Sequence, residues 1–390
     1  MIMEKRLVRI TNAAMEIDKP PHESSKICPL PGLLKLDEAE NTVGPSTKVS
    51  MALAEHVLSW PLNWHGTGNE EEKLIEKLSS HLSLPPEAIS CFNGSMAAID
   101  CAIRTYLEPG VEALLDSPCD RSIQASAQSS GARVIEVKHD NPFEPQIEAI
   151  INRINAKTRL IFLSNPNNQS GAAYTESEIV FLLSYADRIM VIIQEDFVEF
   201  CSSSVADLVM RFPNLIVVRS FSNSFGLASL EAGYLLTDPD NMEFIERLKA
   251  ASNINGLACA AACAALDDLN HIKAYSHAVE QSKRIVLSNL PQTGYEFQLG
   301  PTNFILVQVS NTAEAIELLA DERIYVHHPY EFEDLESYLR ITLGTPAQTE
   351  MLLLALGRAA ETLATGINHS NQEEVVNRPA IRLREMAEVR

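Results

Sequence analysis

Six short apolar runs, most of them separated by helical patterns, constrain the fold of this chain more than any other feature. Patterns typical of helices, such as RSIQASAQSSG and ESEIVFLLSYA, lie between them. Strands that are apolar throughout are buried on both faces, which is typical of a parallel sheet covered by helices. We therefore predict an α/β fold with a mostly parallel sheet sandwiched by helices. The six runs are VEALLD, RVIEV, RLIFLSNP, MVIIQED, LIVVRSFS and AGYLLTD.

The pattern changes after about residue 275. A long helical stretch leads to NFILVQV, IYVHHP and YLRITLG, which alternate apolar and polar residues more strongly and have helices between them. This texture predicts a smaller α+β domain. We predict a large domain over residues 50–274, a small domain formed by residues 1–49 and 275–366, and a polar tail over residues 367–390.

The composition excludes several classes of function. The 31 basic and 52 acidic residues give a net charge of −21, which argues against nucleic-acid partners. No run approaches the 18 apolar residues that a membrane-spanning helix needs. The seven cysteines include no CxxC pair and no zinc-like array. We predict a cytoplasmic protein with reduced thiols and no metal, nucleic-acid or membrane partner.

Polar residues gather where the predicted strands end. Ligands of open parallel sheets lie outside the carboxyl ends of the strands, so these positions are candidates for a binding site. The helix that follows Asn93 begins with free backbone N–H groups, which attract anions. The candidates are Asn168 after RLIFLSNP, Gln194, Glu195, Asp196 and Phe197 after MVII, the stretch from Ser220 to Glu231 after LIVVR, and Gly94 and Ser95 at the helix start.

Four motifs of the sequence resemble segments of a known family of proteins. LDEAENTVGPS, SNPNNQSG, NFILV and YLRITLGTPAQTE resemble, in this order, segments of the fold-type I class I/II aminotransferases that depend on pyridoxal phosphate. The resemblance is to the histidinol-phosphate aminotransferase and threonine-phosphate decarboxylase group and covers roughly residues 33–365. It implies an aminotransferase-like fold, a homodimer with pockets at the subunit boundary, and a cradle for pyridoxal phosphate.

The chain departs from this family where the cofactor chemistry is carried. Asn223 stands at the lysine that forms the Schiff base, and an amide cannot form an imine. Glu231 stands at the arginine that binds the cofactor phosphate, so the charge there is reversed. Gln194 replaces the aspartate beside the ring nitrogen, Phe197 replaces a tyrosine, and Asp120 lies where the family has its PTYxxY segment.

Other family positions are kept. The resemblance implies that Asn168 contacts the ring oxygen of the cofactor and that Arg340 clamps a substrate carboxylate. It also implies a phosphate cup built by Gly94, Ser95, Ser220 and Ser222. A carboxylate clamp opposite an acidic end containing Glu231 and Asp120 suits an amino-acid-like ligand.

We therefore predict that no cofactor is bound, with non-covalent binding of pyridoxal phosphate as the alternative. The favoured function is an enzyme of lysine-independent chemistry that acts on an amino-acid-like metabolite. The alternatives are a non-catalytic binding or partner protein and an enzyme that holds pyridoxal phosphate non-covalently. The candidate catalytic residues are His65, Glu195, Asp196 and Glu231, and Trp64 is a candidate ligand contact beside them.

Overall fold

The predicted α/β architecture is confirmed. The computed structural model describes residues 32–60, 62–63, 69–249 and 254–365. Within them, the central sheet has seven strands in the order β2-β8-β7-β6-β5-β3-β4. Only β8 runs antiparallel to its neighbours, β2 and β7. The strands are β2 (Ile89–Asn93), β3 (Glu112–Asp116), β4 (Arg133–Val137), β5 (Thr158–Ser164), β6 (Met190–Gln194), β7 (Leu215–Ser220) and β8 (Ala232–Thr237).

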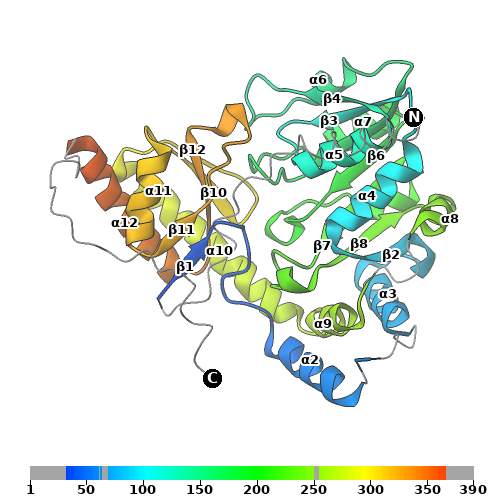
Figure 1. Cartoon of the computed structure of the whole chain (residues 1–390), viewed down its shortest axis with the longest axis horizontal. Helices are drawn as coiled ribbons and strands as arrows, with labels where there is room; N and C mark the ends of the chain where they lie inside the picture. The colour runs from blue at the N-terminus through cyan, green and yellow to red at the C-terminus, as the bar shows by residue number, and fades with distance from the viewer. Residues whose placement is uncertain (1–31, 61, 64–68, 250–253, 366–390) are drawn as a thin grey trace, which may run out of the picture.

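Helices cover both faces of this sheet (Figure 1). Successive residues of a strand point to opposite faces, so Ile161 and Leu163 of β5 pack into one core while Leu160 and Phe162 pack into the other. The first core contains residues of α3 (Asn69–Leu82), α6 (Ile147–Ile151), α7 (Glu176–Tyr185) and α9 (Gly256–Leu266). The second contains residues of α4 (Gly94–Tyr106), α5 (Arg121–Ser129) and α8 (Pro239–Leu248).

A second group of elements forms the small domain. Its strands β9 (Phe297–Leu299), β10 (Phe304–Gln308) and β12 (Tyr338–Thr342) form an antiparallel sheet, and β1 (Leu34–Leu36) pairs in parallel with β11 (Ile324–Val326). The segment around residue 35 therefore joins the small domain. The helices here are α10 (Leu269–Asn289), α11 (Thr312–Asp321) and α12 (Pro346–Thr365).

The helix α10 connects the two parts. It begins beside α9 under the large sheet and runs into the small domain, across the predicted boundary at residue 275 (Figure 1). The helix α2 (Thr47–Ser59) packs on α9. The short 3-10 helices are η2 (Pro86–Ala88), η3 (Val198–Phe200), η4 (Ala206–Met210), η5 (Ala228–Leu230), η6 (Leu290–Thr293) and η7 (Glu333–Leu335). In the described part of the chain, every helix is too short or too polar to cross a membrane.

A glycine in β8 brings the sheet close to the start of α4. A Cβ at Gly233 would lie 2.6 Å from both Gly94 C and Ser95 N, and these are backbone atoms that a side-chain rotation cannot move. By contrast, a Cβ at Gly357 in α12 would have no atom within 4 Å. Because Gly233 has no side chain, α4 can begin close to the ends of the strands.

We expect Gly233→Ala to lower the free energy of unfolding by about 1–3 kcal/mol, because the added methyl group overpacks this contact. Gly357→Ala is the matched control and should stabilise the protein by roughly 0.5–1 kcal/mol, since alanine favours a helix. Urea denaturation of both variants measures the difference. A Gly233→Ala protein as stable as the wild type would contradict the close packing.

Candidate functional site

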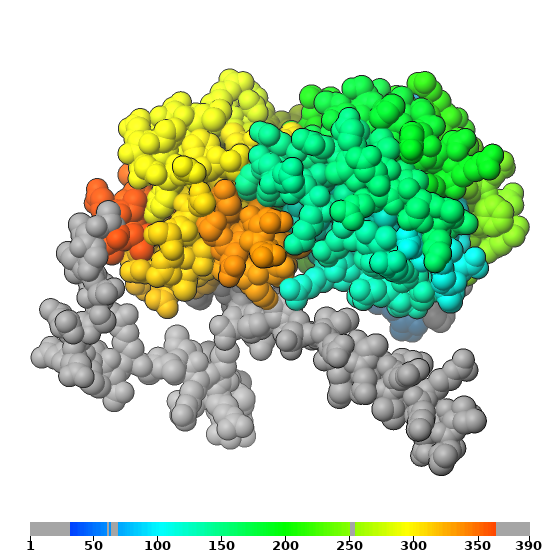
Figure 2. Space-filling model, turned by 90° about the horizontal axis from the view of Figure 1, so that it is seen from above, coloured from blue at the N-terminus to red at the C-terminus, as the bar shows by residue number. Residues whose placement is uncertain are grey.

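A cleft of about 540 Å³ lies between the strand ends of the large domain and the small domain. Figure 2 shows these two parts side by side, with the orange segment of the small domain against the green large domain. From the large domain, Asn168, Asp196 and Asn223 line the cleft. From the small domain, His327 and Arg340 line it. The fold thus brings together five polar residues that are far apart in the sequence.

Asp196 is a buried acid of the cleft, with an exposed fraction of 7%. Its Oδ2 accepts hydrogen bonds from Gln194 Nε2 at 2.5 Å, Asn168 Nδ2 at 3.2 Å and Ser95 Oγ at 3.4 Å. Its Oδ1 is buried and has no hydrogen-bond partner in the described part of the chain. Burial raises the pKa of Asp196 to about 6, although these three donors oppose the shift.

Arg340 carries the charge opposite to that of Asp196 and also has an atom without a hydrogen-bond partner among the described residues. Its guanidinium is held by Nη1, which donates to Asn168 O at 2.9 Å and to Gln169 Oε1 at 3.0 Å, and by Nη2, which donates to Asp37 O at 3.3 Å. Among the described residues its buried Nε has no acceptor. The fixed Nη atoms orient the planar guanidinium, so Nε remains as a donor for a further group.

The rest of the lining makes the cleft acidic. His327 contributes no charge at neutral pH, because burial and the charge of Arg340 lower its pKa to about 3. Glu331 is an acid of the small domain, and burial raises its pKa. Sequence reasoning did not identify Asp37 and Glu38, which follow β1, or Glu331, because these acids are distant in the sequence from the strand ends of the large sheet. The acids that line the cleft are Asp37, Glu38, Asp120, Asp196 and Glu331.

The predicted residues Asn223, Phe197 and Asp120 also line the cleft. Asn223 is half-buried in the turn after β7. The Phe197 ring is buried and packs edge-on against Phe304, with 5.5 Å between the ring centroids. Asp120 also caps α5, since its Oδ1 accepts a hydrogen bond from Ser122 N at 2.7 Å. Asn223 therefore contributes an amide to the lining of the cleft.

Glu231 lies at the start of α4 and outside the cleft lining. It is exposed, with φ of 50° in the left-handed region, and a Cβ at Gly94 would lie 2.7 Å from its Oε2. The carboxylate thus occupies the anion-attracting end of the helix. Nearby, Ser220 Oγ accepts a hydrogen bond from Ser222 N at 3.0 Å. The phosphate cup stays a prediction, and the Glu231 carboxylate lies at the helix start where a phosphate would bind.

The structure does not bring Glu195 into the cleft. Its Oε2 accepts hydrogen bonds from Arg219 Nε at 3.0 Å and Nη2 at 2.8 Å, and its Oε1 accepts one from Val205 N at 2.8 Å. Both charged side chains are buried. A carboxylate satisfied in this way positions the turn after β6 and has no free oxygen facing the ligand space.

Two predicted residues, Trp64 and His65, lie outside the described residues. Their placement at a subunit boundary stays a prediction, as does the homodimer. In the described part of the chain, α2 exposes Met51 and Leu58. These residues are seven apart and therefore lie on one face of the helix.

The residues of the site match pyridoxal phosphate only in part. Asn168 and the hydroxyl groups of Ser95 and Ser220 are suitable donors for it, whereas Asn223 offers no amine for a covalent bond. As placed, the Glu231 carboxylate and a phosphate cannot share the start of α4. Since the Glu231 side chain is exposed, it can turn into solvent. Phosphate binding at this position therefore requires Glu231 to move.

Comparison with known proteins identifies relatives that match most of the chain. Residues 32–356 match the family model of class I and II aminotransferases. The dihydroxyacetone phosphate transaminase Cj1437c of Campylobacter jejuni is 30% identical over 322 residues, which are 81% of this chain and 87% of that protein. Histidinol-phosphate aminotransferase 2 of Pseudomonas aeruginosa is 29% identical over 339 residues, 84% of this chain and 89% of the relative.

Solved structures share the fold. The histidinol-phosphate aminotransferase of Clostridium acetobutylicum superposes with a TM-score of 0.77 at 22% identity and covers 85% of this chain and 100% of its own. That of Sinorhizobium meliloti, solved in complex with pyridoxal 5′-phosphate, has a TM-score of 0.76 at 19% identity, with coverages of 89% and 99%.

These comparisons correct the cofactor prediction. The prediction that no cofactor is bound is wrong, because the relatives are aminotransferases and one structural neighbour contains pyridoxal 5′-phosphate. The prediction gave too much weight to Asn223 and Glu231, since loss of one covalent bond leaves the other contacts to a cofactor in place. The resemblance itself is confirmed by the matching residues and the shared architecture. This chain belongs to the family of class I and II aminotransferases.

Proposed function

We propose that this aminotransferase-family protein binds an amino-acid-like small molecule through Arg340 and Asp196, with chemistry that does not use a lysine Schiff base. One observation carries the proposal. In the same cleft, Asp196 Oδ1 and Arg340 Nε are buried groups of opposite sign without a partner among the described residues, whereas the buried Asp37 carboxylate is ion-paired with Lys35. A zwitterion with an ammonium and a carboxylate group satisfies both.

The cost of leaving Asp196 Oδ1 unpaired supports a ligand at this position. A buried polar atom without a partner costs about 1–3 kcal/mol, and more when it is charged. Three donors hold the other oxygen, so the carboxylate is fixed and ready to accept a further hydrogen bond. An ammonium group supplies both the missing donor and the opposite charge.

The orientation of Arg340 supports a carboxylate as the second group. The guanidinium fork matches a planar carboxylate, and hydrogen bonds to Asn168, Gln169 and Asp37 already fix its plane. Because the fork is held in advance, little conformational entropy is lost when a ligand binds.

The remaining acids suggest the class of side chain. Glu38, Asp120 and Glu331 line the same cleft, and Arg340 is its one permanently charged base among the described lining residues. A ligand whose side chain carries a second positive charge reduces the repulsion among these acids. We therefore propose a basic amino acid or a derivative of one, and L-lysine is a suitable probe.

Asp196 also gives the cleft a group that can exchange protons. Its pKa of about 6 lies close to neutral pH, which suits a general acid or base. We propose that Asp196 accepts a proton from the ammonium group that it binds. Asn223 remains a neutral hydrogen-bonding group, because an amide is neither a base nor a nucleophile at this pH.

Non-covalent binding of pyridoxal phosphate is a second candidate function. Two observations support it: Ser222 N donates to Ser220 Oγ after β7, and Ser95 at the start of α4 and Asn168 both donate to Asp196. These groups need no lysine to bind a phosphate or a ring oxygen. The opposing observation is the Glu231 carboxylate over the same helix start.

If Arg340 binds the carboxylate of the ligand, its loss should weaken the binding of a ligand with a carboxylate and not that of a similar ligand without one. We expect Arg340→Gln to weaken L-lysine binding roughly 10- to 100-fold, because a hydrogen bond between charged groups contributes about 1.5–3 kcal/mol. Cadaverine, which lacks the carboxylate, should bind both proteins equally. Isothermal calorimetry measures both ligands. Equal losses for the two ligands would contradict a carboxylate at Arg340.

The raised pKa of Asp196 predicts a pH-dependent stability of the protein without ligand. Its folded-state pKa is about 6 and its ordinary value is 3.8, so the folded state binds more protons between these values. Stability therefore falls as pH rises through this window, by on the order of 3 kcal/mol. We expect Asp196→Asn to stabilise the protein at pH 8 and to have little effect at pH 4.

Thermal unfolding at both pH values measures this difference. Asp207→Asn is the matched control, since Asp207 is exposed and lies outside the cleft. If Asp196→Asn has the same effect at pH 4 and pH 8, the carboxylate is not the buried, destabilising group described here.

The cofactor question has its own test. We expect Glu231→Gln to raise the affinity for pyridoxal phosphate about three- to tenfold, because an exposed charge pair contributes up to about 1 kcal/mol and the phosphate is a dianion. We expect Asn223→Lys to create an adduct that borohydride fixes to Lys at position 223. Equilibrium dialysis measures the first effect and peptide mapping the second.

The exposed Glu243→Gln serves as the control for a general change of charge. A borohydride-fixed lysine adduct in the wild-type protein would overturn the lysine-independent proposal. An unchanged affinity in Glu231→Gln would show that this carboxylate does not oppose the phosphate.

A further inference from the structure

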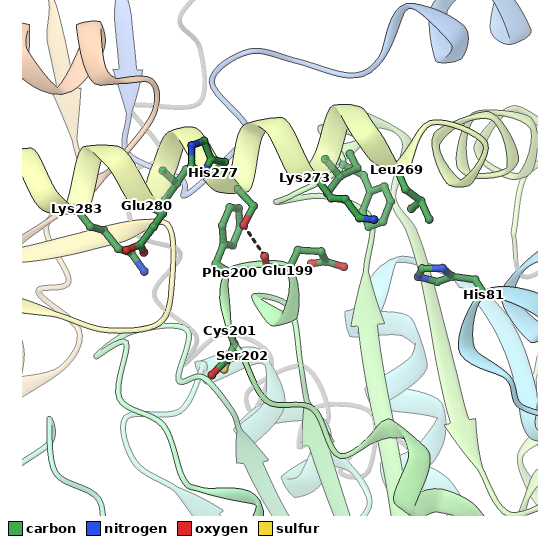
Figure 3. Close-up of a pocket in the computed structure, with 14 residues that line it drawn as sticks. His81, Glu199, Phe200, Cys201, Ser202, Leu269, Lys273, His277, Glu280 and Lys283 are labelled. Atoms are coloured by element: carbon green, nitrogen blue, oxygen red, sulfur yellow. Dashed lines mark hydrogen bonds between the residues drawn. The ribbon is translucent and has the colours of Figure 1, made fainter.

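A second cavity, of about 550 Å³, lies on another side of the turn after β6 (Figure 3). Asp196 and Phe197 of this segment line the cleft, whereas Glu199, Cys201 and Ser202 line the second cavity. One face of α10 forms its opposite wall, and Ser276 Oγ donates a hydrogen bond to Glu199 O at 2.7 Å. The cavity therefore lies between the turn and the helix that connects the two domains.

Glu199 is the unusual group of this cavity. Its Oε2 is buried and meets no geometric hydrogen-bond partner in the described part of the chain, although Ser224 and the backbone N–H of Glu199 lie close enough to the carboxylate to lower its pKa. Arg219 acts on it as a positive charge but is already bonded to Glu195 at 2.8 Å. Burial raises the pKa of Glu199, so a cation or a strong hydrogen-bond donor in the cavity would stabilise the carboxylate.

The two lysines of the lining do not satisfy this carboxylate. Lys283 Nζ donates to the carbonyl oxygen of Gly300 at 2.9 Å. Lys273 is exposed and makes no ion pair with Glu199. Among the described residues, Glu199 therefore has no cation bonded to it.

The rest of the wall near α10 is apolar. Phe225 and Ile272 are buried, and Phe200 and Leu269 are partly buried beside them. Contact with such side chains stabilises a ligand by roughly 25 cal/mol for each Å² of apolar surface removed from water. The cavity volume is within the range of small-molecule sites.

We propose that this second cavity binds a small molecule with one ammonium group and an apolar body, with the ammonium group at Glu199 and the body against Phe225 and Ile272. The site is separate from the cleft that contains Asp196 and Arg340. Its lining combines the Glu199 carboxylate with an apolar wall and therefore suits a ligand without a carboxylate, whereas the cleft also offers Arg340 to a carboxylate.

Calorimetry with n-hexylammonium, and with 1-hexanol as its neutral match, tests the proposal on the full chain. We expect saturable binding of n-hexylammonium that Glu199→Gln weakens at least tenfold, with no change for 1-hexanol. Glu280→Gln is the control, because Glu280 lies on the same lining but is exposed. It should change the affinity less than threefold.

Thiol alkylation locates the probe in the wild-type protein and does not depend on the folding of a variant. Cys201 lines the cavity, while Cys263 lies in α9; both are free and half-buried. We expect n-hexylammonium to slow alkylation of Cys201, as followed by peptide mapping, and to leave Cys263 unaffected. Absence of saturable binding, unprotected Cys201, or a Glu199→Gln variant that binds as well as the wild type would each overturn the proposal.

Discussion

The buried ion pair between Glu195 and Arg219 fixes the geometry on which the rest of the site depends. It joins the end of β6 to the end of β7, and the Glu195 carboxylate also accepts a hydrogen bond from Val205 N. Replacing one partner would leave an unpaired buried charge, so the turn after β6 is strongly constrained. Asp196 must then leave the strand on the side of the cleft, and Glu199 follows one turn later beside the second cavity.

This arrangement gives the acids of the turn different roles. Glu195 has its charge neutralised by a neighbour and serves the fold. Three donors bond Asp196 Oδ2, whereas Oδ1 has no donor among the described residues, so the hydrogen bonding of this carboxylate is incomplete. A buried group that reduces stability is retained most readily where binding or catalysis needs it. The opposite, equally incomplete Arg340 Nε makes ligand binding the simplest account of both groups.

Much of the fold could be predicted from the sequence because the strands of the large sheet are apolar on both faces. The strand β2 was missed, since ISCFN is short and mixes polar with apolar residues between a proline-rich stretch and a helix. The helix α2 was missed because its residues follow a segment without clear periodicity. The structure places Asn168, Asp196 and Asn223, which the sheet edge indicated, in the lining of one cleft.

Pattern reasoning did not separate the roles of neighbouring acids. Glu195 and Asp196 are adjacent, and only the partner of each, Arg219 or Asn168, shows which one is neutralised and which one faces the cleft. The acids Glu38 and Glu331 reach the cleft through packing of the small domain, which leaves no local signature. The cofactor prediction failed for a related reason: single residues were weighed without the whole set of contacts shared by the family.

A crystal structure of the protein with L-lysine would test the central claim most directly. The account predicts the α-ammonium nitrogen within about 3 Å of Asp196 Oδ1 and a carboxylate oxygen at the same distance from Arg340 Nε, as charge-assisted hydrogen bonds require. The side chain should point toward Glu38, Asp120 and Glu331. A ligand bound in the reverse orientation, or a cleft in which Asp196 Oδ1 and Arg340 Nε remain unpaired beside the ligand, would contradict it.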